Sequence, residues 1–307
     1  MSERYLNFFT DYGFKRLFGS EPTKSCLIDF LNSIFEGKEA PIVDLEYRNP
    51  DRLGPAELDR RAIFDLYCTA KDGSQFIVEL QKAKQQFFKD RALFYSTFPI
   101  QEQAQRGNWN FKLGHVYTVA ILDFSFDDGS SRPGKYLYDV KLTEQETKQV
   151  FYDKLTFIYL EMPRFKKTRR ELKTQQDKWL YAIKNISQLE SIPDELKAEI
   201  FERFFQAAEL AKLGPQEKVS YEQSLKYYRD LNNVIDTAFV EGKVEGRVEG
   251  KAEGKAEGLA EGEAKGEVKG RAEERRELAK GMKAQGLDPK LISKITGLSA
   301  ENIEALS

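Results

Sequence analysis

Two acidic residues on consecutive predicted strands are the side chains best placed to do chemistry. Residues 63–70 and 74–81 both alternate between apolar and polar positions, as half-buried strands do. A three-residue loop over 71–73, with glycine in the left-handed position, would pair Asp65 directly with Glu79. A two-residue turn would shift the register by one position and place the two acids on opposite faces of the sheet.

The three-residue register is favoured because it gathers the apolar side chains of both strands on one face. That shared face would hold Phe64, Leu66, Cys68, Ala70, Phe76, Val78 and Leu80. The opposite face would then present Asp65, Glu79 and Gln81 together. Like charges directly opposite each other destabilise a sheet. A divalent cation between the two carboxylates would remove that cost.

Two carboxylates side by side are ligands that Mg²⁺ commonly takes from a protein, while water and substrate phosphate complete its shell. A bound Mg²⁺ polarises a phosphoryl oxygen and helps to generate a hydroxide nucleophile, so the pattern favours phosphoryl chemistry. The spacing by itself also fits two solvated acids on the outer face of a hairpin. The residues around the pair must therefore decide between these two interpretations.

An aromatic and basic motif precedes the hairpin and makes the pattern more specific. The segment 11–19 (DYGFKRLFG), then Asp65, then 78–81 (VELQ) and a strand over 116–124, resembles the PD-(D/E)XK nuclease superfamily. Within the superfamily, it looks like the branch of recombination-promoting nucleases and transposases. The resemblance implies an α/β fold with a restriction-endonuclease-like mixed sheet flanked by helices. It also implies a Mg²⁺- or Mn²⁺-dependent endonuclease that acts on DNA.

The resemblance assigns a role to each residue of the pair and its neighbours. Asp65 and Glu79 would bind the metal ion, with the main-chain carbonyl of Leu80 as a further ligand. Gln81 would stand where many members of the superfamily have a catalytic lysine. Its neutral amide can orient a water molecule but adds no charge. The alternative is therefore a module that keeps the nuclease fold, has lost its activity, and binds nucleic acid or a partner.

Basic residues near the hairpin are candidates for phosphate contacts. Lys82 and Lys84 follow the second strand, although Lys82 would point to the wrong face unless that strand ends at Gln81. Arg91 and Tyr95 lie four residues apart, on one face of a predicted helix. The full set of candidate DNA contacts is Lys15, Lys82, Lys84, Arg91, Tyr95, Lys166, Lys167, Arg169 and Arg170. Ordinary solvated surface charges are the competing interpretation.

Composition sets outer bounds on the function. The 307 residues carry a formal net charge of −2, so attraction to nucleic acid must come from local clusters. Cys26 and Cys68 provide no disulfide framework, and the one histidine, His115, argues against a zinc site and a histidine-based nucleophile. No secretory leader and no membrane-spanning run is evident in the sequence, so we expect a cytoplasmic protein without membrane contact.

The chain divides into four predicted parts. Residues 1–165 would form the nuclease core, and 166–238 a helical region that either packs on that core or serves a partner. A tetrapeptide-repeat arm follows over 239–270. The last part, 271–307, is a small helical tail. Its final helix, near 300–304, lacks Lys and Arg, which favours a docking role over reading of a DNA groove.

The repeat arm has glycine at every fourth position from Gly242 to Gly270. Each glycine within a helix costs about 1 kcal/mol relative to alanine. The four-residue period also stacks like charges, with Glu241 above Glu245 and an equivalent row of Lys and Arg. Two helices could pair the acidic stripe of one with the basic stripe of the other, so the arm predicts a homo-oligomer. A flexible linker is the alternative.

Overall fold

The computed structural model describes residues 3–49, 51–52, 62–104, 109–126 and 134–306. The chain forms two compact units, Met1–Val234 and Ile235–Ser307. Among the described residues, no helix combines the length and the apolar character needed to cross a membrane. The first unit contains the predicted hairpin, so it is the unit that positions the candidate site.

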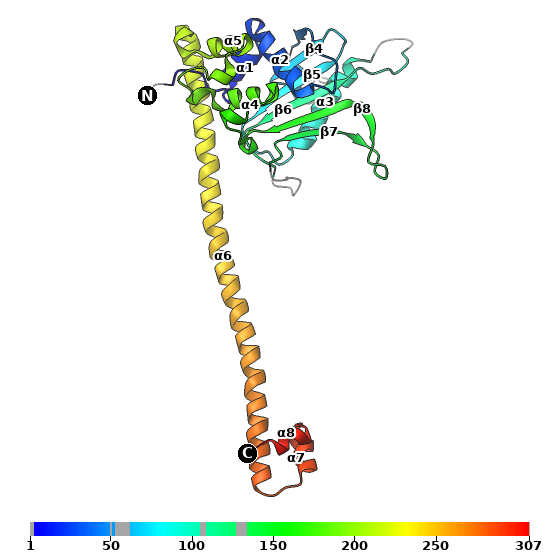
Figure 1. Cartoon of the computed structure of the whole chain (residues 1–307), viewed down its shortest axis with the longest axis vertical. Helices are drawn as coiled ribbons and strands as arrows, with labels where there is room; N and C mark the ends of the chain where they lie inside the picture. The colour runs from blue at the N-terminus through cyan, green and yellow to red at the C-terminus, as the bar shows by residue number, and fades with distance from the viewer. Residues whose placement is uncertain (1–2, 50, 53–61, 105–108, 127–133, 307) are drawn as a thin grey trace. The chain divides into compact units, whose positions relative to one another are not determined.

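A six-stranded mixed sheet forms the centre of the first unit (Figure 1). Its strands, in spatial order, are β1 (Leu45–Tyr47), β4 (Leu66–Ala70), β5 (Gln75–Gln81), β6 (Val116–Leu122), β8 (Val150–Glu161) and β7 (Leu137–Thr143). The central strands β5, β6 and β8 run parallel, and the others pair antiparallel. A separate two-stranded sheet joins β2 (Asp51–Arg52) to β3 (Ala62–Ile63). The mixed α/β class predicted from the sequence is confirmed.

The parallel strands bring three chain segments to one edge of the sheet. Gln81 of β5 pairs with Leu122 of β6, which pairs in turn with Glu161 of β8, so the three strands end side by side. We call this border the carboxyl edge. In open α/β sheets, ligands bind outside the carboxyl ends of the strands. Residues that directly follow these three strands therefore lie where a substrate is expected.

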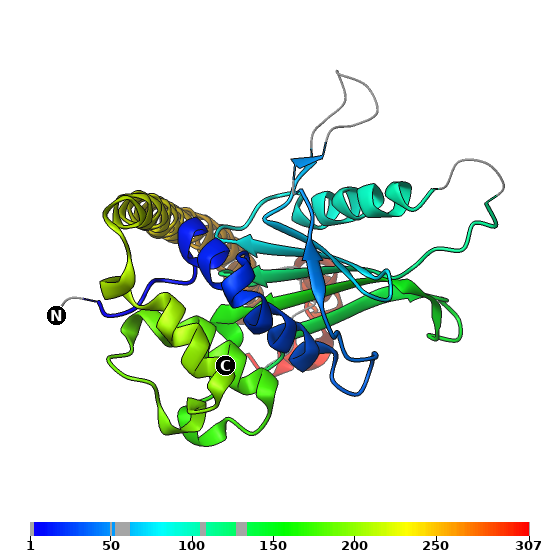
Figure 2. The same ribbon diagram turned by 90° about the horizontal axis from the view of Figure 1, so that it is seen from above.

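Helices cover both faces of the sheet (Figure 2). One face carries α3 (Phe88–Glu102), and the other carries α1 (Asp11–Phe18), α2 (Lys24–Phe35), α4 (Gln175–Asn185) and α5 (Glu199–Ala208). The long helix α6 (Pro215–Ala284) begins in this unit. Short 3₁₀ segments occur at Glu21–Thr23, Met162–Arg164, Arg169–Glu171, Ile186–Gln188, Asp194–Leu196 and Leu210–Lys212.

The larger core lies between the sheet and the face that carries four helices. Buried rings meet there, with the centroids of Phe18 and Trp179 5.9 Å apart and those of Trp179 and Phe204 5.1 Å apart, both edge to face. Side chains of α4, α5 and the first turns of α6 belong to the same cluster as those of the strands. The helical region after residue 166 is therefore packed on the core, an assignment that the sequence left open.

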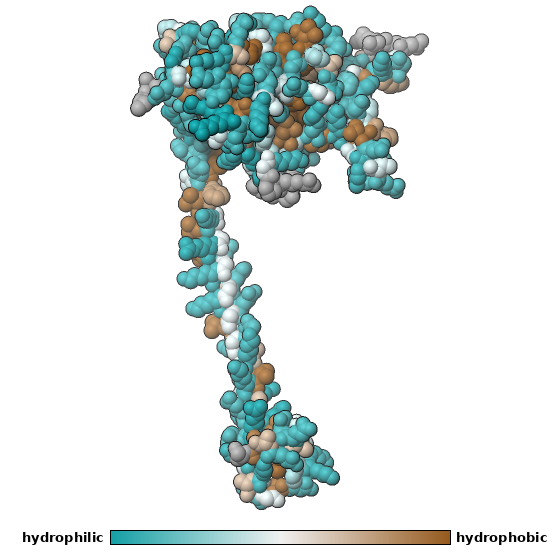
Figure 3. Space-filling model, in the orientation of Figure 1, coloured by the Kyte–Doolittle hydropathy of each residue, from teal (hydrophilic) through white to brown (hydrophobic). Residues whose placement is uncertain are grey.

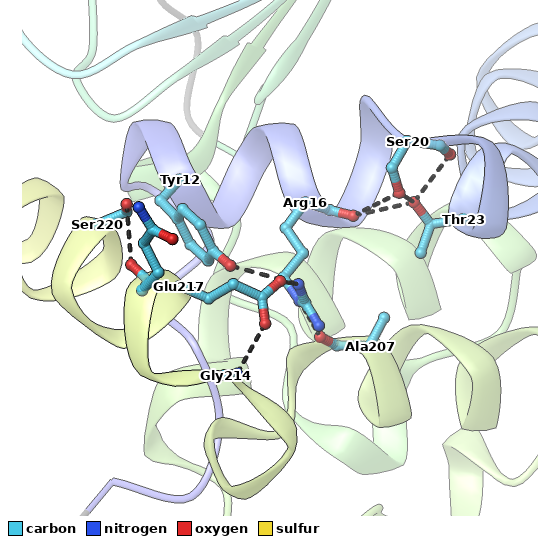
Figure 4. A network of polar contacts seen from close by, with 9 residues as sticks. Tyr12, Arg16, Ser20, Thr23, Ala207, Gly214, Glu217 and Ser220 are labelled. Atoms are coloured by element: carbon cyan, nitrogen blue, oxygen red, sulfur yellow. Dashed lines mark hydrogen bonds and ion pairs between the residues drawn. The ribbon is translucent and has the colours of Figure 1, made fainter.

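Polar contacts tie α1 to the first turn of α6 (Figure 4). The Arg16 guanidinium donates to Glu217 at 2.5 Å. At the other end of α1, the Thr10 hydroxyl caps the helix by accepting from the Gly13 N–H at 3.0 Å. A Cβ on Gly13 would lie only 2.1 Å from the Asn7 carbonyl oxygen. The first glycine of the 11–19 motif, Gly13, is therefore required by the close approach of this backbone.

The second unit consists of the remainder of α6 and two short helices, α7 (Pro289–Thr296) and α8 (Ala300–Glu304). α6 continues as one helix through the repeat arm, and every residue from 233 to 278 is exposed. Figure 3 shows a pale band between teal side chains along this helix, which fits glycines interleaved with charged residues. A helix so exposed gains nothing from burial within its own chain.

The tail folds on a small core of its own. Ala279, Ile292 and Ile303 are buried against one another. The Asp288 side chain caps α7, as its place before proline predicts, and Gly286 adopts φ +77° just beyond the end of α6. The end of α6 and the two short helices thus form a compact helical cap on the arm.

Candidate active site

The hairpin of β4 and β5 adopts the predicted three-residue register. Leu66 pairs with Val78, and the same register continued by one residue places Asp65 opposite Glu79. The loop between the strands has Gly73 at φ +86°, a left-handed conformation that glycine adopts without steric cost. The register prediction is therefore confirmed.

One part of the hairpin prediction is wrong, because Phe64 does not share the apolar face of Leu66. The Phe64 ring instead lies 5.4 Å from that of Tyr67 and belongs, with Ile77, to a cluster on the α3 side. The reason is that β4 begins at Leu66 and the chain bends at Asp65, so strand alternation does not extend back through this residue. Asp65 therefore precedes the strand.

Hydrogen bonds bring Asp65, Glu79 and Gln81 together. The Asp65 N–H donates to Glu79 Oε1 at 3.3 Å, and Glu79 Oε2 accepts from the Gln81 side-chain amide at 3.1 Å. The Asp65 carboxylate turns towards the main chain of Leu80, whose N–H donates to Oδ2 at 2.7 Å. Glu79 is only 6% exposed and Gln81 9%. The interpretation of the pair as solvated surface acids is therefore excluded for Glu79.

Burial and mutual repulsion dominate the electrostatics of the pair. Burial, followed by the negative charge of Asp65, raises the pKa of Glu79 to about 8, against the opposing effects of Arg91 and Gln81. Burial also raises the pKa of Asp65, although the hydrogen bond from Leu80 opposes this. Groups kept out of water next to a like charge hold their protons unless a cation takes their place.

The pair offers oxygen donors of the kind that a divalent cation prefers. Main-chain N–H and C=O groups of one strand residue point to the same neighbouring strand, so the Leu80 carbonyl is directed to the side on which its N–H meets Asp65. A cation there would turn the repulsion between the two carboxylates into attraction, so this donor set fits Mg²⁺ or Mn²⁺. No group of three or more His, Cys, Asp or Glu side chains forms a candidate metal site among the described residues, and this pair contributes two carboxylates.

Lys82 lies at the carboxyl edge but faces away from Gln81. The strand ends at Gln81, yet the Lys82 ammonium turns to the α1 side and binds Asp11 at 2.8 Å. Its side chain is only 10% exposed and lies 5.5 Å from the centre of the Tyr227 ring of α6. The charges of Lys82 and of the exposed Lys15 both act to lower the pKa of Asp65. The 11–19 motif therefore contributes charge beside the acid pair.

Arg91 approaches the pair from α3. Its guanidinium lies 5.7 Å from the centre of the Tyr95 ring, so the two residues share a helix face as predicted. One guanidinium nitrogen, Nη1, donates to the side chain of Gln85. The other, Nη2, is buried without a hydrogen-bond partner among the described residues. A buried arginine N–H left in this way, on a side chain whose charge acts on Glu79, is suited to an incoming anionic oxygen.

The remaining predicted contacts lie in two segments that leave the carboxyl edge. Lys84 is exposed in the loop after β5. In the run after β8, Lys167 binds Asp177 at 2.6 Å and Arg169 donates to the Tyr181 hydroxyl at 3.2 Å. Lys166 and Arg170 of the same run are exposed. The structure therefore places these basic residues after strands that end at the site, without bringing them onto the acid pair.

Sequence reasoning missed Asp123 and the tyrosines of α6. Asp123 directly follows β6 and accepts a hydrogen bond from the Tyr228 hydroxyl at 2.6 Å, while its N–H donates to the Gln81 carbonyl at 2.9 Å. A carboxylate placed directly after a seven-residue apolar strand was the available signal. Nothing in the sequence indicated that α6 would supply its partner.

A protein-family model matches most of the chain. A model described as PD-(D/E)XK nuclease family transposase matches residues 8–238, well over half of the chain. Searches of curated proteins and of solved structures gave no match. The matched segment contains the acid pair, the whole six-stranded sheet and the helices packed on it. The chain therefore belongs to the PD-(D/E)XK nuclease family of transposases.

Proposed function

We propose that this protein is a metal-dependent DNA endonuclease with a restriction-endonuclease-like core, acting in recombination or transposition. The observation that carries the proposal is Asp65 beside Glu79 at the carboxyl edge, where the Glu79 carboxylate is buried and is hydrogen-bonded both to the Asp65 N–H and to Gln81. Placing two like charges side by side in a protein interior is unfavourable. Such arrangements cluster at functional sites, where a cation or a substrate compensates them.

The residues of the pair would hold the metal ion. Asp65, Glu79 and the Leu80 carbonyl are the proposed ligands of Mg²⁺ or Mn²⁺, which when bound polarises a phosphoryl oxygen and lowers the pKa of a water molecule. Gln81 gives an amide hydrogen to Glu79, so its carbonyl oxygen remains to accept a hydrogen bond from the attacking water and orient it. The family resemblance implies that the attacking water displaces the 3′-oxygen, which leaves a 5′-phosphate and a 3′-hydroxyl.

Cations around the pair are suited to the DNA backbone. Arg91 presents a buried N–H to a phosphate oxygen, which makes a strong, charge-assisted hydrogen bond. The exposed Lys15, Lys84, Lys166 and Arg170 supply contacts that depend on charge and not on base sequence. Binding is therefore expected to weaken steeply with salt while remaining tolerant of sequence.

Cleavage of supercoiled plasmid tests the proposal. Full-length wild-type protein should nick the plasmid with Mg²⁺ or Mn²⁺ and not with EDTA. Asp65→Asn and Glu79→Gln each remove one anionic ligand and should reduce nicking to the level of the protein-free control. DNA affinity in EDTA should stay within about threefold, because phosphate contacts carry it.

The matched control is Glu46→Gln, which removes an exposed carboxylate from the neighbouring strand β1. It should cleave as the wild type does. Wild-type cleavage by Glu79→Gln would exclude this carboxylate as a ligand. Metal-independent binding without any cleavage, in wild type and variants alike, would instead support a module that keeps the nuclease fold without activity, the outcome that a neutral Gln81 leaves open.

A further inference from the structure

A cavity of about 320 Å³ opens beside the carboxyl edge, between the loop after β5 and the segment after β6. Its floor is aromatic. The ring of Phe88 lies 6.1 Å from that of Phe124, and the ring of Phe126 lies 6.0 Å from that of Phe124, both edge to face. Phe88 and Phe126 are buried, whereas Phe124 is half-buried. A flat apolar group could therefore stack there without disturbing the core beneath.

The rim of the cavity is polar. Gln85 and Gln86 contribute carboxamides, and Asp90 contributes a carboxylate. The Lys89 ammonium lies 4.8 Å from the centre of the Phe126 ring. Carboxamides pair with the edge of adenine, carboxylates accept from exocyclic amino groups, and lysine donates to guanine. An aromatic floor with such a rim has the chemistry of a nucleobase site and not of a site for an aliphatic ligand.

Arg91 connects this cavity to the acid pair. Its Nη1 donates to Gln85 in the cavity wall, and its charge acts on Glu79 to lower the pKa of that carboxyl group. Its Nη2 is buried and has no hydrogen-bond partner among the described residues. Arg91 therefore contacts the cavity wall and also acts on the acid pair. A nucleotide bound here would place its base in the cavity and its phosphate beside the pair.

We propose that the cavity receives the base of an unpaired nucleotide adjacent to the scissile phosphate, while Arg91 holds that phosphate. The inference rests on the proposed nuclease function and adds its substrate class, which is single-stranded DNA or a duplex with an extruded base. A base inside a paired stack cannot offer its face to the aromatic floor. Enzymes that need such access act on single strands or flip the nucleotide out of the duplex.

Binding of oligonucleotides with and without bases tests the inference. Full-length protein in Ca²⁺, at one fixed salt concentration, is titrated with a single-stranded DNA and with an abasic strand of the same length, for wild type and for Phe124→Ala. Stacking of a base on an aromatic ring makes the base-bearing strand bind about tenfold more tightly to the wild type. In Phe124→Ala, this ratio should fall towards one, with the affinity for the abasic strand unchanged.

Two further variants guard against a folding effect. Gln86→Trp changes an exposed rim position and should also lower the ratio by filling the cavity. Phe151→Ala removes an aromatic ring that is 80% exposed at the opposite end of β8 and should leave the ratio intact. An equal ratio in the wild type, Phe124→Ala and Gln86→Trp would overturn the inference. So would an equal loss of affinity for both strands in Phe124→Ala with an unchanged melting temperature.

The same comparison separates failure of this inference from failure of the nuclease function. The binding ratio is measured without cleavage, so it reports on the cavity even if Asp65→Asn and wild type show the same activity. With Mg²⁺, the wild type should cut a duplex that carries one bulged nucleotide about tenfold faster than its fully paired counterpart. If the wild type cuts both duplexes at the same rate and Asp65→Asn is inactive, the proposed nuclease function stands and the proposed base site is wrong.

Discussion

Asp123 is the residue through which the long helix α6 meets the end of the central strand. Burial raises its pKa to about 6, and the hydrogen bond from Tyr228 and the charge of Lys184 oppose this only in part. The folded protein therefore keeps this proton between about pH 4 and 6, where the unfolded chain has already released it. Since stability falls with pH wherever the folded state binds more protons, ionised Asp123 weakens the fold near neutral pH.

Asp123→Asn should therefore make the protein more stable at pH 7, by about 1–2 kcal/mol given its partial exposure. The asparagine carbonyl can still accept from the Tyr228 hydroxyl. Between pH 4 and 6, wild-type stability should fall relative to the variant, and below pH 4 the two should converge. Urea unfolding at a series of pH values measures this difference.

A control on the same helix is Asp236→Asn, which changes an exposed carboxylate of α6. It should leave the pH dependence of unfolding as in the wild type. Tyr228→Phe removes the donor to Asp123 and should steepen the fall of stability with pH. A pH profile of Asp123→Asn that parallels that of the wild type would show that Asp123 titrates in the ordinary acid range.

The residues of the site differ in how far their sequence context determines them. Asp65, Glu79 and Gln81 could be grouped because strand alternation and one loop length fix their register. Short-range geometry of that kind can be predicted from a sequence. The position of Phe64 could not be read, because a bend at Asp65 breaks the alternation. Asp123 and Tyr228 are 105 residues apart, and no local pattern encodes such a contact.

At the scale of elements, the repeat in α6 sets a geometric constraint. A helix turns by 100° per residue, so a four-residue period advances the glycine stripe by about 40° at each repeat (4 × 100° − 360°). When the repeat period of a stripe exceeds 3.6 residues, two helices that pair along the stripe wind around each other with a right-handed twist. Small residues at four-residue spacing also allow close, right-handed crossings. These features support pairing of two arms, which stays a prediction.

Replacing Gly246, Gly250 and Gly254 by alanine separates helix stability from association. Nothing lies within 4 Å of a Cβ built at these positions, so each change should add about 1 kcal/mol to the stability of the helix. If the arms pair through the glycine stripe, the new methyl groups hold them apart, and association should weaken although helicity rises. Circular dichroism measures the helicity, and sedimentation equilibrium measures the association.

Val248→Ala, on a different face of the same stretch, serves as the comparison. It should alter association much less than the triple variant. Stronger association of the triple variant, in step with its helicity, would mean that the glycines are not the contact surface. Unchanged association would also mean that the glycines are not the contact surface. The repeat would then act as a tether for the terminal helices.

At the scale of the whole molecule, the described residues hold one acid pair of this kind at the carboxyl edge, and one such site cuts one strand. Deleting residues 240–270 should leave the first unit folded, because its three hydrophobic clusters draw no side chain from the arm. The deletion variant should still nick a plasmid but should lose double-strand cleavage, which needs two chains on one duplex. Gel analysis of nicked and linear products checks this.

Two results for the deletion variant would contradict the proposed role of the arm. Linear product at the wild-type ratio to nicked product would show that two strands are cut without the arm. The same number of chains per particle for wild type and deletion variant in sedimentation would independently show that the arm does not drive association. The arm could be predicted from the sequence because its four-residue period is explicit. The packing of the helices after residue 166 could not be predicted. It depends on contacts of Trp179 and Phe204 with residues of α1 and α2, which are far away in the chain.

The boundary between the two compact units has one more consequence. It falls between Val234 and Ile235, inside α6 and not in a loop. A protease that attacks exposed chain finds no irregular segment there, and a cut must first unwind a turn of helix. A fragment that ends short of Tyr228 would also uncover the Asp123 carboxylate. Proteolytic fragments of the protein should therefore retain the first part of α6. Proteolysis should shorten the arm gradually and should not remove it in a single cut.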